Sequence, residues 1–229
     1  MRVLAQGAGL APAEARMRLM PEPPAVVVRS EEAEALAKAL TAVGAPALAI
    51  DPTLRHGPVV AHRFELGPAQ VTFVTPDGRE TEVSYGDVRL ILRGLRLTRS
   101  EQSRTETVRK FSLGKALLTQ GLMMTTTQKR EVRSEVINPF HAAMIYGADG
   151  MSVLLDESEL VFQSLGAALR PSRVENLNTL VGELRKRASA ARFDDRLLRL
   201  GPRPLALAVG DPFDVVAEIL NQAQLRGLL

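Results

Sequence analysis

The residues best suited to chemistry lie in "RKFSLGKALLTQGLMMTTTQKR", residues 109–130, where Gly114-Lys115 looks like part of a phosphate-binding loop. Such a loop needs the pattern G-x-x-x-x-G-K-[ST], because its backbone amides cradle the phosphates and its hydroxyl holds Mg²⁺. Here Arg109 replaces the first glycine and Ala116 replaces the hydroxyl residue. Both chemical parts are missing, so the stretch is not a nucleotide-binding P-loop.

Two other functions stay open for the same stretch: binding of an anion without a P-loop, and binding of a protein. Its basic residues offer charge-assisted donors to phosphate or carboxylate, and its leucines and methionines suit an adaptable protein-binding surface. The plain alternative is a solvated basic connection whose apolar centre packs on the body of the protein. The residues of this candidate partner-binding segment are Arg109, Lys110, Lys115, Leu117, Leu118, Met123, Met124, Lys129 and Arg130.

Positive charge is concentrated around this segment. The whole chain carries +3, whereas residues 99–135 hold eight Lys/Arg against four acids, a net +4. Nucleic acid or an anionic membrane surface is therefore an alternative partner, and such binding would weaken steeply with salt. Stacking on single-stranded bases is disfavoured, because the seven Phe and two Tyr do not gather among the basic residues.

Patterns for catalysis and metal binding are weak. The chain has no cysteine, which excludes disulfides, thiolate ligands and cysteine nucleophiles. His56, His62 and His141 do not show metal-ligand spacing. The acidic groups at 156–159 and 194–195 are expected to cap a turn and to form local ion pairs. We expect no catalytic residue, no cofactor and no metal, although an enzyme site assembled from distant residues is left open.

The first 51 residues predict a small α/β unit. Apolar residues recur at helical spacing from Ala33 to Val43, with Ser30 placed as an N-cap and Gly44 placed to end the helix. In chain order we expect a strand at 1–6, a helix at 12–20, a strand at 25–30, a helix at 31–43 and a strand at 45–51. Residues 52–60, rich in proline, read as a linker.

After the linker the apolar period changes to that of strands. "PDG" at 76–78 predicts a hairpin between strands at 69–75 and 79–85, with Gly78 at a position that needs positive φ. "GADG" at 147–150 predicts a second hairpin between 141–146 and 151–157. Two further strands are expected at 87–94, with one buried face, and at 159–166.

The best helix of the sequence is "SRVENLNTLVGELRKR", residues 172–187. Ser172 and Glu175 predict a capping box, and Val174, Leu177, Val181 and Leu184 form one apolar stripe. Beyond it, we expect a strand at 204–209 and a helix from about Phe213 to Leu225.

The phrases "VSYGDVRLILRG" and "SRVENLNTLVGELRKR" resemble a PH-like fold, a bent antiparallel sheet closed by one C-terminal helix. Residues 1–51 resemble the small α/β domains of ferredoxin-like regulators and of the ribosomal stalk protein. The pairing is similar to that in bacterial proteins of unknown activity. The resemblance implies an α+β protein with a unit at 1–51, a linker at 52–60, a PH-like domain at 61–200 with a basic insertion at 99–135, and a strand and helix at 201–229.

PH-like modules are generally binding platforms rather than enzymes, so the resemblance implies a protein-binding or scaffolding component. Its partner would be another protein or a second copy of the chain. The N-terminus lacks the unbroken apolar core of a signal peptide, and no window approaches the roughly 18 apolar residues of a spanning helix. We therefore expect a soluble, cytoplasmic protein.

Overall fold

The computed structural model describes residues 2–19, 30–50, 57–111, 125–199 and 212–228, and of 98–111, 125–137, 149, 199 and 212 it describes the backbone alone. Two compact units are present. One consists of Met1–Leu97 with Pro139–Leu229, and the other of Thr98–Asn138.

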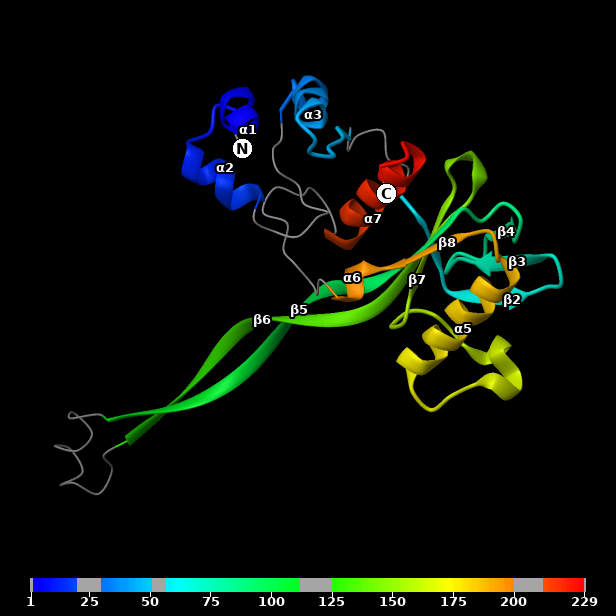
Figure 1. Cartoon of the computed structure of the whole chain (residues 1–229). Coiled ribbons are helices and arrows are strands. Elements are labelled where there is room, and N and C mark those ends of the chain that lie inside the picture. Colours follow the sequence, from blue (N-terminus) through cyan, green and yellow to red (C-terminus); the bar gives the residue numbers. More distant parts are fainter. Residues whose placement is uncertain (1, 20–29, 51–56, 112–124, 200–211, 229) are drawn as a thin grey trace, which may run out of the picture. The chain divides into compact units, whose positions relative to one another are not determined.

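The strands form two sheets, and helices accompany them, so the chain is an α+β protein. The five-stranded sheet has the order β1 (Val59–Ala61), β7 (Ser152–Asp156), β6 (Thr125–Tyr146), β5 (Leu90–Phe111) and β8 (Arg192–Asp195) (Figure 1). The three-stranded sheet has the order β2 (Arg63–Leu66), β3 (Gln70–Val74) and β4 (Glu80–Ser84). The sheet expected at 61–200 was antiparallel throughout; this is wrong for the five-stranded sheet, because β1 pairs with β7, and β5 with β8, in parallel.

The first predicted hairpin is confirmed. β3 and β4 pair antiparallel from Gln70 opposite Ser84 to Val74 opposite Glu80. Gly78 has φ of 84°, as the turn requires. The hydroxyl oxygen of Thr75, in the turn, accepts the Arg79 N–H at 3.1 Å.

The second predicted hairpin is also confirmed. β6 and β7 pair antiparallel from Ala142 opposite Asp156 to Tyr146 opposite Ser152. A 3-10 turn, η2 (Ala148–Gly150), joins them, and Arg89 braces it by donating Nε–H to the Gly147 carbonyl at 2.7 Å.

Helix α5 (Arg173–Arg187) confirms the strongest helix prediction. Ser172 is the N-cap, but its side chain makes no capping hydrogen bond, so the predicted capping box is wrong. The neighbouring Asn176 side chain instead bonds both the N–H and the carbonyl of Arg170, at 2.6 and 2.9 Å. The apolar side of α5 shares one core with both sheets; the largest members include Phe64, Phe73, Ile91, Leu155, Leu177 and Leu180.

A second core covers the other face of the five-stranded sheet. Helix α7 (Pro212–Leu225), near the predicted position, contributes Phe213 and Leu220, which cluster with Leu90 and Leu92 of β5. The expectation of one buried face for 87–94 is therefore wrong. Ile91 packs in the α5 core while its neighbours pack in the α7 core, because helices cover both faces.

Helices make up the regular structure of the described N-terminal residues, 2–19 and 30–50. Helices α1 (Arg2–Gly7), α2 (Pro12–Leu19) and α3 (Ala33–Ala42) enclose a small core that includes Leu4, Ala15, Leu36 and Leu40. The helices predicted at 12–20 and 31–43 are confirmed. The strand predicted at 1–6 is wrong, because Leu4 packs against other helices, and no strand occurs at 45–50.

The remaining strand predictions have different outcomes. The strand expected at 159–166 is wrong, since its second half is the 3-10 helix η3 (Gln163–Ala168). A short helix, α6 (Arg196–Arg199), follows β8 directly. The expected strand at 204–209, and residues 25–29 of an earlier one, lie outside the described residues.

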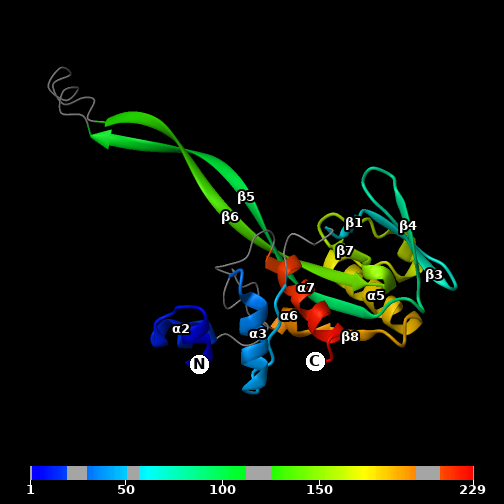
Figure 2. The same ribbon diagram turned by 90° about the horizontal axis from the view of Figure 1, so that it is seen from above.

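The expected basic insertion at 99–135 is strand in its described parts, 99–111 and 125–135. β5 and β6 are 22 residues each and lie side by side (Figures 1 and 2). Strands in globular proteins usually have 3–10 residues. The length of this pair is the least ordinary feature of the fold.

Candidate functional site

The candidate partner-binding residues divide into two groups. Arg109 and Lys110 lie in β5, and Lys129 and Arg130 lie in β6. The remaining five, which are Lys115, Leu117, Leu118, Met123 and Met124, lie outside the described residues.

Pairing on the flanks of the long strands stops early. Among the described pairings, β8 runs beside β5 only from Leu90 to Leu92, and β7 runs beside β6 only from Ala142 to Tyr146. In Thr98–Asn138, the regular structure that is described consists of these two strands. Each strand therefore has a backbone edge with no described strand partner, which is a template for pairing with another chain.

Asp156, the last residue of β7, and Asp194, the last but one of β8, have the same hydrogen bonding. Asp156 Oδ1 accepts the N–H of Ser158 at 2.9 Å, and Asp194 Oδ1 accepts that of Arg196 at 3.0 Å. Such Asx turns divert the backbone from a strand. Asp156 also pairs with Arg96 at 3.2 Å, and Asp194 with Arg196 at 2.8 Å. The expected turn cap and local ion pair are confirmed.

The opposite sheet face ends in a second polar group. By strand alternation its members share a face with core residues two positions away: Arg93 with Ile91, His141 with Ala143, Glu157 with Leu155 and Asp195 with Phe193. Glu157 is 6% exposed, and its Oε1 accepts the His141 N–H at 2.9 Å. Its own N–H donates to the His141 carbonyl at 3.0 Å. The side chain thus completes the β6–β7 ladder one residue beyond β7.

The second polar group combines the Arg93 cation with the carboxylates of Asp195 and Glu157. Burial lowers the pKa of Arg93, and the negative charges of Asp195 and Glu157 oppose that shift. The guanidinium stays protonated at physiological pH. Arg93 Nε, His141 Nδ1 and Glu157 Oε2 are buried with no hydrogen-bond partner among the described residues. We assign the group to holding the strand ends rather than to catalysis.

Sequence reasoning did not bring these residues together. It treated the acids near 156 and near 194 as separate local features, and Arg93 and Arg96 as part of a basic stretch. One signal was available, since each acidic pair directly follows an apolar strand, in "SVLLDE" and "ARFDD". Using it required knowing that β7 and β8 flank the β5–β6 pair, which is long-range information.

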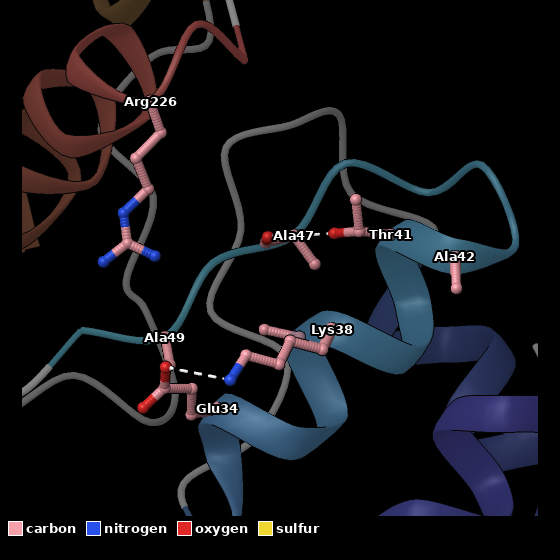
Figure 3. A pocket seen from close by; sticks show the side chains of 8 residues that line it. Glu34, Lys38, Thr41, Ala42, Ala47, Ala49 and Arg226 are labelled. Carbon is pink, nitrogen blue, oxygen red and sulfur yellow. Dashed lines mark hydrogen bonds and ion pairs between the residues drawn. The ribbon is translucent and has the colours of Figure 1, made fainter.

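A shallow hollow lies beside α3 (Figure 3). Its polar groups are already engaged, since Lys38 pairs with Glu34 at 3.4 Å and the Thr41 hydroxyl donates to the Ala47 carbonyl at 3.3 Å. Arg226 adds one cation, and much of the remaining wall is alanine. The hollow does not show the convergent polar groups of a specific ligand site.

In the described parts of the chain, no group of three or more His, Asp or Glu side chains is arranged to hold a metal ion. None of the described helices combines the length and apolar character needed to cross a bilayer.

Comparison with known proteins adds no relative: no family model, no curated protein and no solved structure matches the chain. The edges of β5 and β6 that have no strand partner among the described residues are therefore the candidate functional site on geometry alone.

Proposed function

We propose that this chain is a non-enzymatic, cytoplasmic protein-binding or scaffolding component that binds through the open edges of β5 and β6. The observation that carries the proposal is that two neighbouring 22-residue strands are flanked by other strands for only a few residues. A two-stranded ribbon is marginally stable by itself, and a third strand adds backbone hydrogen bonds and packing. A partner segment that adds to an edge supplies that strand.

The PH-like resemblance supports a binding role and stays part of the proposal. The antiparallel sheet β2–β4 and helix α5 share one core, as a PH-like platform would require. The parallel pairs of the larger sheet depart from that pattern, so no binding residue is carried over from the resemblance. The ferredoxin-like likeness of 1–51 adds nothing, because strands were expected at 1–6 and 45–51, where residues 2–7 are helical and 45–50 are irregular.

A shortened-ribbon variant tests the proposal. Residues 98–138 are replaced by Asn-Gly, which favours a two-residue hairpin turn, and the full chain is the reference. Both proteins are purified at low salt from the cells of origin, treated with nuclease and weighed by native mass spectrometry. We expect protein mass beyond the 24.9 kDa chain for the full chain only. Urea unfolding shows whether the remaining body of the variant is folded.

Two results would contradict the proposal. One is a bare 24.9 kDa full chain. The other is a folded shortened-ribbon variant that carries the same additional partner mass as the full chain does, because the ribbon would then be dispensable for binding.

A second candidate function is electrostatic binding of nucleic acid or an anionic membrane surface. The observation that favours it is the charge of Thr98–Asn138, which contains eight Lys/Arg and four acids and so carries a net +4. Since the whole chain carries +3, the remainder carries −1. Replacing Lys110, Lys115, Lys129 and Arg130 with serine should then abolish binding to duplex DNA or phosphatidylserine vesicles at low salt. Full binding by that variant would exclude this candidate.

A further inference from the structure

Positive charge is confined to one part of the ribbon Thr98–Asn138. Residues 107–130, the distal part, contain five Lys/Arg and no acid, whereas 98–106 and 131–138, the proximal part, contain three Lys/Arg and four acids. The net +4 of the ribbon is therefore entirely distal. Four of the five distal cations lie at the end of β5 and the beginning of β6, which run side by side (Figures 1 and 2): Arg109, Lys110, Lys129 and Arg130.

The composition of the two strands favours a polar partner. In 98–111 only Val108 and Phe111 are apolar, and in 125–138 the apolar residues are Val132, Val136 and Ile137. A strand added to either edge would gain its affinity from backbone hydrogen bonds and from charge rather than from buried apolar side chains. Opposite charges on neighbouring strands stabilise their pairing, and like charges oppose it.

Charge and open edges together select the kind of partner. A second ribbon would bring two units of +4 together, and these repel each other. Nucleic acid has the right charge, but it cannot supply the N–H and C=O groups that complete a strand edge. An extended protein segment with acidic side chains supplies both.

We propose that the partner of the ribbon is an extended, acidic segment of another protein, which adds to an open edge with its carboxylates beside the distal part. The inference rests on the proposed binding function of the ribbon and names the chemistry of its partner. The main chain of the segment extends the ladder as a third strand. Its carboxylates accept charge-assisted hydrogen bonds from the distal lysines and arginines.

Three labelled peptides of about ten residues test this chemistry on the full chain, by fluorescence anisotropy at about 0.15 M salt. A Thr-Glu repeat should bind, because threonine favours strands and glutamate supplies the carboxylates. A Thr-Lys repeat keeps the strand tendency and reverses the charge. A Glu-Pro repeat keeps the carboxylates, but proline lacks the N–H that a ladder needs. We expect both of these to bind at least about tenfold more weakly.

Two variants of equal charge locate the site on the chain. The distal variant replaces three distal cations: Lys110→Ser, Lys129→Ser and Arg130→Ser. The proximal variant replaces the three proximal cations: Arg99→Ser, Arg104→Ser and Arg133→Ser. Each changes the net charge of the chain from +3 to zero, so the overall attraction for an acidic peptide falls equally. The distal variant should bind the Thr-Glu repeat about tenfold more weakly than the native chain, and the proximal variant within about threefold of it.

Four results would overturn the inference. They are a Thr-Glu repeat that does not bind the native chain at about millimolar concentration, a Thr-Lys or Glu-Pro repeat that binds as tightly, a distal variant that binds as the native chain does, and a proximal variant that loses as much as the distal one. Equal binding of the Glu-Pro repeat would mean that charge alone attracts the peptide. Urea unfolding shows whether the variants fold, and the three peptides on the native chain decide the inference if they do not.

The two proposals fail in different ways. A full chain that carries partner mass, which the shortened-ribbon variant lacks, yet does not bind the Thr-Glu repeat would refute the acidic chemistry and leave the binding function standing. A folded shortened-ribbon variant that keeps its partner mass would refute both.

Discussion

At the scale of single residues, Glu157 illustrates how a side chain can end a strand ladder. Its carboxylate accepts a hydrogen bond from the His141 N–H at 2.9 Å. A backbone carbonyl would accept this hydrogen bond if the β6–β7 ladder continued. The side chain is 6% exposed, so the interaction is shielded from water. The neighbouring Asp156 then turns the chain away by accepting the Ser158 N–H.

Removing this acceptor should destabilise the fold. Glu157→Ala leaves the His141 N–H without its partner, and we expect the free energy of unfolding to fall by about 1–3 kcal/mol. Glu157→Gln keeps an oxygen acceptor at the same reach and should lose less. Urea unfolding of the two variants and the native chain measures both values. Equal losses would show that the hydrogen bond to His141 is unimportant.

The turn between β3 and β4 predicts a pH effect. The Thr75 hydroxyl donates to Asp77, and Arg79 Nε donates to it at 2.7 Å, so the pKa of Asp77 lies below its usual 3.8. A carboxyl whose pKa is lowered by folding contributes stability above its unfolded pKa, and that contribution is lost as the pH falls through the folded value.

Asp77→Asn, which does not titrate, isolates this contribution. The native chain should exceed the variant in unfolding midpoint near pH 6, and the difference should shrink as the pH falls below about 4. Urea midpoints across that range measure it. A difference that stays constant down to pH 3 would mean that the lowered pKa has no consequence for stability.

At the scale of elements, Gly94 lets β5 approach its neighbours. A Cβ added there would lie 2.6 Å from Leu197 Cβ and 2.8 Å from Phe213 Cε2, well inside contact distance. Gly94→Ala should therefore lower the free energy of unfolding by about 1–3 kcal/mol through overpacking.

Gly182 is the matched control for that substitution. It lies inside α5, and a Cβ there would meet nothing within 4 Å. Gly182→Ala should raise stability by about 0.5–1 kcal/mol, because alanine favours the helix. Thermal and urea unfolding of both variants give the comparison, and a Gly94→Ala variant as stable as the native chain would refute the close packing of β5.

Local signals explain which elements the sequence could predict. The hairpin at 76–78 and helix α5 depend on neighbours within a few residues, and both were predicted from turn residues and apolar period. Residues 1–6 were misread because a short apolar run suits either a strand or a buried helix. Only packing among the N-terminal helices decides between them.

The candidate site was predicted in location but not in form. The concentration of basic residues predicted a binding site at 109–130. It did not predict the two long strands, because polar residues occupy both alternating positions there and no apolar period marks a strand. The group around Arg93 depends on strand order, which a single sequence does not reveal. The two buried faces of β5 were missed for the same reason, since the cover supplied by α7 comes from more than 100 residues away.

At the scale of the whole molecule, the charges predict how salt affects each proposed partner. Binding to duplex DNA by the +4 unit should weaken by about 100-fold or more between low and physiological salt, because counterions are released. Pairing of a protein segment with an open edge of β5 or β6 should change by less than about tenfold, because backbone hydrogen bonds and packing supply it rather than the release of counterions. Sedimentation and DNA titrations over the same salt series compare the two.

The central claim is that the open edges of β5 and β6 are the binding surface. Amide hydrogen exchange, followed by mass spectrometry on the full chain with its co-purified partner and on the same chain after the partner has been removed, tests it most directly. We predict that peptides covering 98–107 or 127–137 exchange more slowly when the partner is bound, while peptides covering 173–187 do not change. Exchange that is the same with and without the partner in both strand segments would contradict the claim.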